Sequence, residues 1–499
     1  MRITPVVLLG LLALFVGVAE PANILGVFTS TSPSHNIVHI EYIKAMVERG
    51  HNVTVVTTQP LKDKNPKYHH IYLPQEKKII DSVFYLLEEQ AEPLRNPLFL
   101  DLMNNPDNKF DLVIIGYFSN DFHLGIGAHF KCPIVLSFTS AANNLQDRYI
   151  GNPPEVAYVT ALSLFAPPDP MKFTGRLTNF MINFLWKILQ YFLQRHSETL
   201  YSEIFPPSKY PPFEETKKMV SLVLLNSHFT DGFIRPHVPA VVEVGGIQIK
   251  QKPDPLPENL QKIINASSEH GVIYVSFGSH IKPSDINPQL NENIFKALAG
   301  LKQTVLWKWN DAEKPGNAPN IFYEKWLPQD DLLANPKVKL FITHAGKGGV
   351  IESQYHGVPM VAIPLFFDQV SNAAQVERHG FGLELDQHTL KAEVLRTAVL
   401  EVLENPKYVK KAQQFSKLYR DRPMNAKDTA VFWLEYVLRH KGAYHMQSPM
   451  VHLNSFQYLS LDVIGFLVLV IFLVYKTVTI TTKFVFKKIS AKLQKIKKH

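Results

Sequence analysis

Short apolar runs alternate with segments of helical apolar spacing along the first half of this chain. Residues 23–28 and 53–57 read as buried strands, and residues 37–50 between them repeat apolar side chains at helical spacing. A strand, a turn-rich loop over 29–36, a helix and a second strand form a βαβ unit. Further apolar runs repeat the strand pattern at 110–116, 133–138 and 219–226. The pattern predicts an α/β domain with a mainly parallel sheet.

A second alternating series follows a proline-rich stretch, Lys252–Pro257, which reads as a linker between domains. An apolar run at 242–246 leads into this linker. The second series begins with a strand predicted at 272–277 and continues with strands and helices predicted at 291–301, 305–309, 338–343, 349–356 and 360–363. A chain of 499 residues is too long for one core. We therefore expect Rossmann-like domains over 20–245 and 258–445, joined by a linker over 246–257, with ligand bound between the carboxyl ends of their strands.

The region from about 150 to 220 is rich in proline and aromatic residues. A helix is predicted within it, over residues 177–198. Its aromatic side chains either line an apolar pocket for an acceptor or pack the helix in the ordinary way. The sequence does not choose between these two interpretations.

The two ends of the chain differ from its middle. A charged start, an apolar stretch and small residues predict a secretory signal peptide over 1–19, with a buried N-terminal helix as the alternative. Near the other end, residues 458–475 are apolar except for one serine and Asp462, and this is about the shortest length that spans a bilayer. We therefore expect one transmembrane helix over 458–475, followed by a basic tail over 476–499.

That tail accounts for the whole net charge. It carries eight lysines and no acidic residue, and the formal net charge is +8, so the rest of the chain is neutral overall. The basic pI therefore gives no reason to expect a nucleic acid partner. Lysines that follow a membrane helix stay in the cytosol, which predicts a type I protein with luminal domains. Lys495 and Lys497 resemble a dilysine signal for retrieval to the endoplasmic reticulum, with a basic stop-transfer flank as the alternative.

Cys132, the only cysteine, stands beside a proline in an apolar segment and is expected in the core. The chain has no Cys-x-x-Cys pair and no ligand-spaced Cys/His set, so a zinc site is not expected. Asn52 and Asn265 begin N-glycosylation sequons. Asn265 is the better candidate, because it lies near a polar helix end whereas Asn52 starts a predicted strand.

One run of the chain combines four chemistries in a fixed order. An indole and an amide come first, in Trp326-Leu-Pro-Gln329. A histidine then precedes a glycine-rich turn, His344-Ala-Gly-Lys-Gly-Gly349, which follows a predicted strand and opens a helix where backbone N–H groups can point at an anion. Glu352 follows inside that helix, and Asp368-Gln369 closes the run. The run suits an aromatic base, a diphosphate, a ribose and a sugar.

This run resembles the signature of the UDP-glycosyltransferases, the eukaryotic UDP-glucosyl and UDP-glucuronosyl transferases. The shared order of motifs also includes Val244-Gly-Gly246, Tyr274-Val-Ser-Phe-Gly-Ser279, Trp307-Lys308, Pro359, Pro364 and the membrane anchor with its lysine tail. The resemblance covers nearly the whole chain and is greatest to invertebrate members of the insect type. It implies the GT-B fold, in which two facing Rossmann-like domains with parallel sheets bind the donor and the acceptor.

The resemblance also implies roles in a donor site. Trp326 is expected to stack on uracil, Gln329 to bond the nucleoside, and Glu352 to hold the ribose. The diphosphate is expected to contact Ser279, His344 and the backbone of Gly346, Gly348 and Gly349. Asp368 and Gln369 are expected to bind sugar hydroxyls. Arg235 and Lys308 are weaker candidates for phosphate or sugar contacts, with a solvated surface charge as the alternative.

For catalysis, the family supplies a histidine after the first strand and an aspartate that orients it. The matching residues are His35, in the first loop, and Asp121. A neutral imidazole can take a hydroxyl proton near pH 7, and a carboxylate behind it stabilises the imidazolium. His39, one helical turn further on, is the rival. The chain contains no Asp-x-Asp sequence, which agrees with stabilisation of the leaving group by a helix dipole and side-chain donors instead of a metal ion.

The glycine turn departs from the family pattern. Relatives commonly have His-Gly-Gly and a hydroxyl-bearing residue further on, whereas this chain has Ala345, Lys347 and Gly349. We expect the Lys347 ammonium to pair with the diphosphate, a charge-assisted contact of about 1.5–3 kcal/mol, with a solvent-facing lysine as the alternative. Gly116 stands where relatives often carry glutamate.

These features predict an inverting glycosyltransferase of the endoplasmic reticulum membrane. It would transfer a hexose, with UDP-glucose as the expected donor, to small lipophilic acceptors in detoxification, without a cofactor or metal. The altered turn keeps a non-catalytic UDP-sugar-binding or regulatory homologue as an alternative, and a structural or transport partner in the membrane as another. The sequence identifies no acceptor and does not choose between a monomer and a homo- or hetero-oligomer.

Overall fold

The computed structural model describes residues 21–61, 66–75, 83–141, 147–153, 155–160, 170–230, 234–267, 269–279, 281–366 and 368–496. The predicted signal peptide, over 1–19, lies outside these residues. The chain forms two compact units, of which the first ends at Gln447 and the second begins at Ser448.

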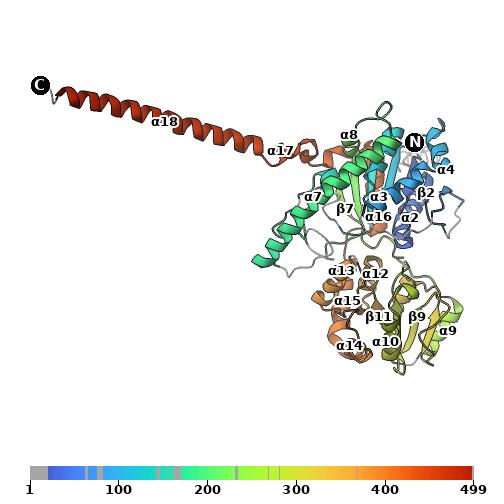
Figure 1. Cartoon of the computed structure of the whole chain (residues 1–499). Helices are drawn as coiled ribbons and strands as arrows, with labels where there is room; N and C mark the ends of the chain where they lie inside the picture. Colours follow the sequence, from blue (N-terminus) through green and yellow to red (C-terminus); the bar gives the residue numbers. More distant parts are fainter. Residues whose placement is uncertain are drawn as a thin grey trace, which may run out of the picture. The chain divides into compact units, whose positions relative to one another are not determined.

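Two parallel sheets form the framework of the first unit (Figure 1). The seven-stranded sheet has the order β3-β2-β1-β4-β5-β6-β7. Its strands are β1 (Asn23–Phe28), β2 (Asn52–Thr57), β3 (Tyr68–Tyr72), β4 (Leu112–Gly116), β5 (Ile134–Phe138), β6 (Val220–Leu225) and β7 (Val241–Glu243). The six-stranded sheet has the order β10-β9-β8-β11-β12-β13. Its strands are β8 (Val272–Ser276), β9 (Thr304–Lys308), β10 (Ile321–Glu324), β11 (Val338–Thr343), β12 (Met360–Ala362) and β13 (Gly382–Glu384).

Helices flank both sheets. The helices of the first unit are α2 (Pro33–Glu48), α3 (Val83–Ala91), α4 (Pro97–Asn104), α5 (Gly125–Phe130), α6 (Asp147–Ile150), α7 (Phe173–Ile204), α8 (Phe213–Lys217), α9 (Glu258–Ala266), α10 (Pro288–Leu298), α11 (Gln329–Leu333), α12 (Lys347–His356), α13 (Gln369–His379), α14 (Ala392–Glu404), α15 (Pro406–Arg420) and α16 (Ala426–Arg439). Short 3-10 turns are η1 (Glu92–Arg95), η2 (Asp121–Leu124), η3 (Pro283–Asp285) and η4 (Tyr444–Met446). Every pair of neighbouring strands is parallel, so each crossover runs over a face of its sheet.

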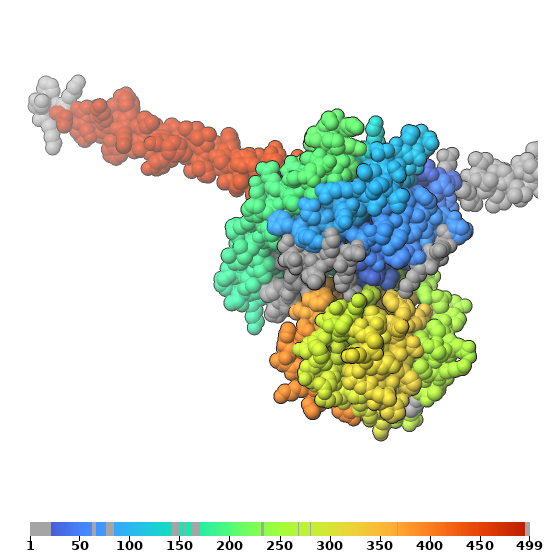
Figure 2. Space-filling model, turned by 45° about the vertical axis from the view of Figure 1, so that its right-hand side comes forward, coloured from blue at the N-terminus to red at the C-terminus, as the bar shows by residue number. Residues whose placement is uncertain are grey.

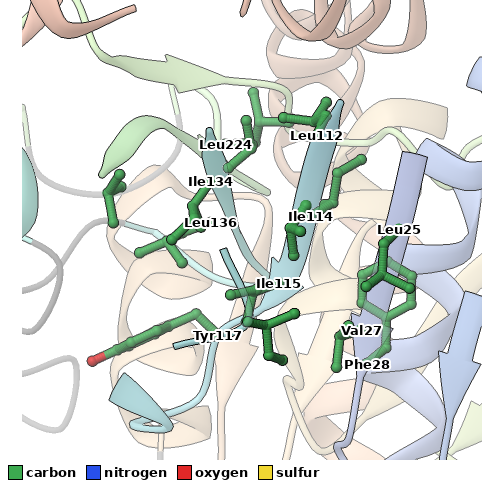
Figure 3. Close-up of a cluster of buried hydrophobic side chains, with 14 of the residues drawn as sticks. Leu25, Val27, Phe28, Leu112, Ile114, Ile115, Tyr117, Ile134, Leu136 and Leu224 are labelled. Carbon is green, nitrogen blue, oxygen red and sulfur yellow. The ribbon is translucent and has the colours of Figure 1, made fainter. Parts of the chain in front are cut away.

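The core of the first sheet consists of the apolar runs visible in the sequence. Leu25, Leu112, Ile114 and Leu136 have no exposed side-chain surface, and Figure 3 shows side chains from β1, β4 and β5 gathered in this core. A parallel sheet that helices cover on both faces buries every position along its central strands. This explains why these strands read as continuous apolar runs instead of alternating ones.

Helix α16 follows the second sheet in the chain but belongs to the core of the first. Ala430, Leu434 and Val437 are fully buried in the same hydrophobic cluster as the seven-stranded sheet. The Arg49 Nε atom at the end of α2 also donates to Glu435 of α16 at 2.8 Å. The segment 426–445, which was predicted to belong to the second domain, therefore packs against the first sheet.

The second unit contains η5 (Pro449–His452), α17 (Ser455–Tyr458) and α18 (Leu461–Ile496). A positive φ of 53° at Ser460 separates α17 from α18, so the apolar helix begins at Leu461 and not at residue 458. Its 36 residues give a length of about 54 Å. Within the described part of the chain, α18 is the one helix long and apolar enough to cross a membrane.

Candidate functional site

The carboxyl edge of the second sheet gathers residues from five neighbouring strands. Trp326 follows β10, Lys308 ends β9, Ser279 follows β8, His344 follows β11, and Asp368 and Gln369 follow β12. The strands are parallel, so these positions meet at one edge. The chain order of the strands reverses between β8 and β11, and open α/β sheets bind ligands at such a point.

His344 lies between two turns of backbone at this edge. A Cβ atom on Gly278 would lie 2.8 Å from the imidazole ring, and a Cβ atom on Gly346 would lie 2.4 Å from it. The close approach therefore requires glycine at both positions. Burial, and after it the charge of the nearby Lys308, lowers the pKa of His344 to about 4. The imidazole is neutral at pH 7, where it carries one N–H donor.

The Lys308 ammonium contacts both the Gly278 backbone and the Trp326 ring. Its ammonium donates to the backbone carbonyl of Gly278 and lies 5.4 Å from the centre of the Trp326 ring. This is a cation–π distance. The Trp326 side chain is 49% exposed, so a face of the indole remains available to a ligand. A half-exposed indole at a strand end is suited to stack on an aromatic base.

A chain of hydrogen bonds orients Glu352. The Tyr274 hydroxyl donates to Gln329 Oε1 at 3.0 Å, and Gln329 Nε2 donates to Glu352 Oε2 at 2.7 Å. Tyr274 itself stacks on Phe341, with ring centres 4.9 Å apart. Burial raises the pKa of Glu352 to about 8, although the bond from Gln329 opposes this rise. The sequence assigned Tyr274 no role, although it begins the shared motif Tyr274-Val-Ser-Phe-Gly-Ser279 and places a hydroxyl within an apolar strand.

The glycine turn leads into the start of α12. Gly346 is the N-cap residue and has no side chain with which to cap the helix. The backbone N–H groups of the first helical turn have no carbonyl partner within the helix, and their partial positive charge favours an anion. Ala345 has a φ of 60°, which glycine adopts more readily, and its methyl group is fully buried. A Cβ atom on Gly349 would lie 3.3 Å from Gln329 Nε2, whereas one on Gly348 would have no neighbour within 4 Å. A hydroxyl-bearing side chain at 349 would therefore press on the group that orients Glu352.

Asp368 and Lys347 lie within electrostatic reach of each other. Burial raises the pKa of the Asp368 carboxyl, and a hydrogen bond from Asn372 and the charge of Lys347 oppose the rise. The Asn372 amide donates to Asp368 Oδ2 at 3.0 Å. Gln369 is buried, and its Oε1 atom accepts two backbone N–H groups at 2.9 and 3.1 Å. Because the side-chain oxygen of Gln369 already accepts these two bonds, we expect a ligand to contact the side-chain nitrogen.

Arg235 belongs to a buried ion pair of the first sheet's domain. Its Nη2 atom lies 2.6 Å from Asp147 Oδ2, and both side chains are less than a tenth exposed. Burial raises the pKa of Asp147, and the Arg235 guanidinium opposes this rise. The structure thus places Arg235 against the start of α6.

His35 lies in the first turn of α2 and not in the loop where we expected it. Pro33 occupies the first helical position, a place that suits proline, and so the helix begins before the apolar pattern does. The Nδ1 atom of His35 lies 3.0 Å from Ser30 Oγ. Its ring centre is 5.4 Å from that of Phe118, in an edge-to-face arrangement. Ser30 is a partner that the sequence analysis missed.

Asp121 is buried at the start of η2, three residues after Phe118. Its Oδ1 atom accepts hydrogen bonds from the Tyr117 hydroxyl at 2.5 Å and from the Tyr149 hydroxyl. Strands β1 and β4 are neighbours in the sheet, so the segments that carry His35 and Asp121 leave it side by side. The His35–Phe118 contact joins these two segments.

His39, the rival base, is a buried histidine of the core. It is 2% exposed, its Nδ1 atom lies 2.8 Å from Ser137 Oγ, and its ring stacks on Phe28. Burial lowers its pKa to about 3. A Cβ atom on Gly116 would lie 2.8 Å from His39 Nε2, which explains the glycine at this position. His39 is closed to a substrate hydroxyl because it is enclosed by the core.

The remaining predictions concern the cysteine, the two glycosylation sequons and possible metal ligands. Cys132 is buried, as expected. Asn52 at the start of β2 and Asn265 near the end of α9 are both exposed. Among the described residues, no group of three or more His, Cys, Asp and Glu side chains could hold a metal ion.

Comparisons with known proteins agree on one family. The model of the family described as "UDP-glucoronosyl and UDP-glucosyl transferase" matches residues 100–499. UDP-glycosyltransferase UGT5 of Dactylopius coccus is 34% identical over 94% of both chains. UDP-glucuronosyltransferase 1A10 of Homo sapiens is 32% identical over 94% of this chain and 92% of its own. The solved UDP-glucosyltransferase of Polygonum tinctorium, described as glucosylating indoxyl, is 17% identical with a TM-score of 0.59, over 84% of this chain and 99% of its own; it shows the shared GT-B fold.

Proposed function

Because the chain belongs to the UDP-glucuronosyl and UDP-glucosyl transferase family, we propose that it transfers a hexose from a UDP-sugar to a hydroxyl of small lipophilic acceptors. The chain is a UDP-glycosyltransferase, and conjugation of this kind is consistent with detoxification. UDP-glucose is the expected donor. The observation that carries the proposal is the Tyr274–Gln329–Glu352 chain of hydrogen bonds beside the open start of α12.

The donor would follow the carboxyl edge of the second sheet. The uracil would stack on Trp326 and bond to Gln329, and Glu352 would take the ribose hydroxyls. The first N–H groups of α12 and the neutral His344 would bind the diphosphate with Ser279. Asp368 and Gln369 would hold the sugar. The exposed indole, the buried and oriented carboxyl group and the uncapped helix start support this order.

His35 would act as the base on the acceptor. When Nδ1 donates to Ser30 Oγ, Nε2 bears the lone pair that takes the hydroxyl proton. The acceptor oxygen then forms a bond to the anomeric carbon as the bond from that carbon to UDP breaks on the opposite face. The UDP oxygen leaves with the electron pair, and the configuration inverts. Asp121, fixed by two phenols, would stabilise the imidazolium.

A single-residue variant tests this role. Full-length protein in lipid nanodiscs is supplied with UDP-glucose or UDP-glucuronic acid and a panel of phenols, and the products are identified by mass spectrometry. The His35→Ala variant is expected to lose at least about 100-fold in kcat, because general bases contribute this much, and to bind UDP as the wild type does. Glucoside formation at the wild-type rate would remove His35 from this role. Binding of the UDP-sugar by wild-type protein without any release of UDP would favour a non-catalytic binding homologue.

The metal-free mechanism and the location are also proposals. Rates in EDTA should equal those with added divalent cations, since helix and side-chain donors would stabilise the leaving group. The apolar helix α18 fits a single-pass anchor. We place the protein in the endoplasmic reticulum membrane with its domains in the lumen, where Asn265 would carry a glycan. Loss of the peptide-N-glycosidase F shift in Asn265→Gln checks the last point.

A further inference from the structure

A polar hollow lies at the amino edge of the first sheet. Its volume is about 530 Å³, which is within the range of small-ligand sites. The neighbouring strands β3, β2 and β1 begin beside it, and residues 107–110, just before β4, complete its lining. Figure 2 shows the blue segments of the chain, which carry this lining, at the surface of the first unit. The lining includes Asn23, Asn52, Lys67, Tyr68, Asn108 and Lys109.

Asn52 places a glycosylation sequon at this hollow. It begins the sequon Asn52-Val-Thr54 and is also the first residue of β2. Its side chain is exposed, and its Nδ2 atom donates to Asn23 Oδ1 at 3.1 Å. A glycan replaces one of the two hydrogens on Nδ2, so the other hydrogen can keep this bond. Although Asn52 lies in a strand, the structure therefore leaves its amide open to modification.

The groups beside the sequon suit a carbohydrate. Lys67 and Lys109 are exposed, and their ammonium groups can donate to sugar hydroxyls and acetamido carbonyls. The Asn108 amide nitrogen donates to the Leu102 carbonyl at 2.8 Å, and the amide oxygen can accept from a sugar hydroxyl. The Tyr68 ring adds apolar surface to the lining. Polar groups set around an apolar surface are typical of sites that bind small organic molecules.

A second hollow continues from the first. Its volume is about 400 Å³, and Asn108 and Lys109 line both hollows. A glycan is a bulky chain of sugars that stays attached to the protein surface. Two hollows with a shared wall can hold more than one sugar of such a chain. This arrangement favours a covalently attached glycan over a single small ligand.

We propose that Asn52 carries an N-linked glycan whose first sugars lie in this hollow. The modification requires the luminal location proposed above. There, Nδ2 of Asn52 forms a bond to the anomeric carbon of an oligosaccharide carried on a lipid diphosphate. The bond from that carbon to the diphosphate oxygen breaks, the lipid diphosphate leaves with the electron pair, and Nδ2 loses a proton. The glycan lies at the amino edge of the sheet, whereas His35 and Asp121 follow the carboxyl ends of β1 and β4.

Sequon variants of the full-length protein from a eukaryotic secretory system test the modification. The Asn265→Gln protein keeps the sequon at Asn52 and should lose apparent mass when peptide-N-glycosidase F acts on it after denaturation. In this background, Thr54→Val should abolish the loss and Thr54→Ser should preserve it, because the sequon requires a hydroxyl. No loss of mass in the Asn265→Gln protein would overturn the proposal. A glycan on Asn265 alone would leave the luminal location standing, and a glycan on neither site would overturn both.

The rate of glycan removal from the native protein tests the place of the sugars. The enzyme must reach the bond between asparagine and the first sugar, so a glycan held in the hollow waits for local opening. The Asn52 glycan should be removed at least about tenfold more slowly than the Asn265 glycan of the Asn52→Gln protein. Denaturation should make the two rates equal.

Substitutions in the lining provide the matched variant. Lys67→Ala with Lys109→Ala should reduce the native difference to about threefold or less, because hydrogen bonds to the sugars are lost. The rate at Asn265 should stay unchanged. Equal native rates for the two wild-type glycans would overturn the proposal. A difference that both alanine substitutions leave unchanged would also overturn it.

Discussion

Burial gives Glu352 an unusual protonation state for a carboxylic acid. Its pKa of about 8 lies above the ordinary value of 4.5, so the neutral form dominates at pH 7. The folded state therefore binds more protons here than the unfolded state does between these two values. The stability contributed by this group is complete below about pH 4.5 and is lost as the pH rises through about 8. The Gln329 amide donates to Glu352, and a carboxyl oxygen can accept this hydrogen bond in both the neutral and the ionised form of Glu352.

UDP binding is expected to release a proton from Glu352. A carboxylate that accepts two ribose hydroxyls is a better acceptor than the neutral acid, so the nucleotide favours the ionised form. The UDP affinity should then rise up to about tenfold from pH 7 to 8 and level off above the pKa. Calorimetry in two buffers of different ionisation heat measures the proton. Glu352→Gln should bind without proton release, and an unchanged release in this variant would assign the proton elsewhere.

The expected pairing of Lys347 with the diphosphate can be tested by a single substitution. It stands at the first helical position of α12, within electrostatic reach of Asp368. If its ammonium pairs with the diphosphate, Lys347→Ala should weaken UDP binding by about 1.5–3 kcal/mol, which is roughly 10- to 150-fold in Kd. Lys339→Ala, in the same sheet, is the control, since the Lys339 ammonium donates to the Pro336 carbonyl at 2.7 Å. Equal UDP affinities of wild type and Lys347→Ala would rule the pairing out.

At the scale of elements, the sequence predicted central strands well and edge strands poorly. The runs at 23–28 and 338–343 coincide with β1 and β11, which lie inside their sheets. No predicted run corresponds to β3, β10 or β13, and each of these is an edge strand. An edge strand is shorter or half exposed, so it lacks the continuous apolar run that marks a buried parallel strand.

Helix boundaries show a related effect. The apolar pattern predicted a helix from residue 177 to 198, whereas α7 extends from Phe173 to Ile204. The same pattern began the first helix at residue 37, whereas α2 starts at Pro33. Apolar periodicity marks the part of a helix that packs against a core, and hydrogen bonds continue the helix beyond it. This difference matters for His35, which stands in the added turn.

A contact between distant elements supports the packing of α16. Glu435, which is mostly buried, accepts from Arg49 Nε at 2.8 Å and lies 3.7 Å from His51 Nε2. Glu435→Ala should lower the free energy of unfolding by about 1–2 kcal/mol, because Arg49 is half exposed and water screens much of the pair. We expect a fall of roughly 2–8 °C in the thermal midpoint. Glu401→Ala, at an exposed ion pair of α14, should change it by less than about 1 °C.

At the scale of the whole molecule, the orientation in the membrane can be tested. The lysines after α18 predict that the tail is cytosolic and the first unit luminal. Protease added to intact microsomes should remove a C-terminal epitope tag and leave a protected fragment that contains Asn265. Detergent should expose that fragment to digestion. Digestion of the large fragment in intact microsomes, with the tag protected, would reverse the orientation.

The sequence by itself determined the family, the two parallel sheets and the order of the candidate donor-site residues. It could do so because apolar runs and glycine turns act over short stretches, where periodicity and motif spacing can be read directly. Only the tertiary structure decided that His39 is a core residue, that Tyr274 supports Glu352 through Gln329, and that α16 returns to the first sheet. These outcomes depend on contacts between residues far apart in the chain. Burial, pKa shifts and exposed faces arise from such contacts, and no local pattern encodes them.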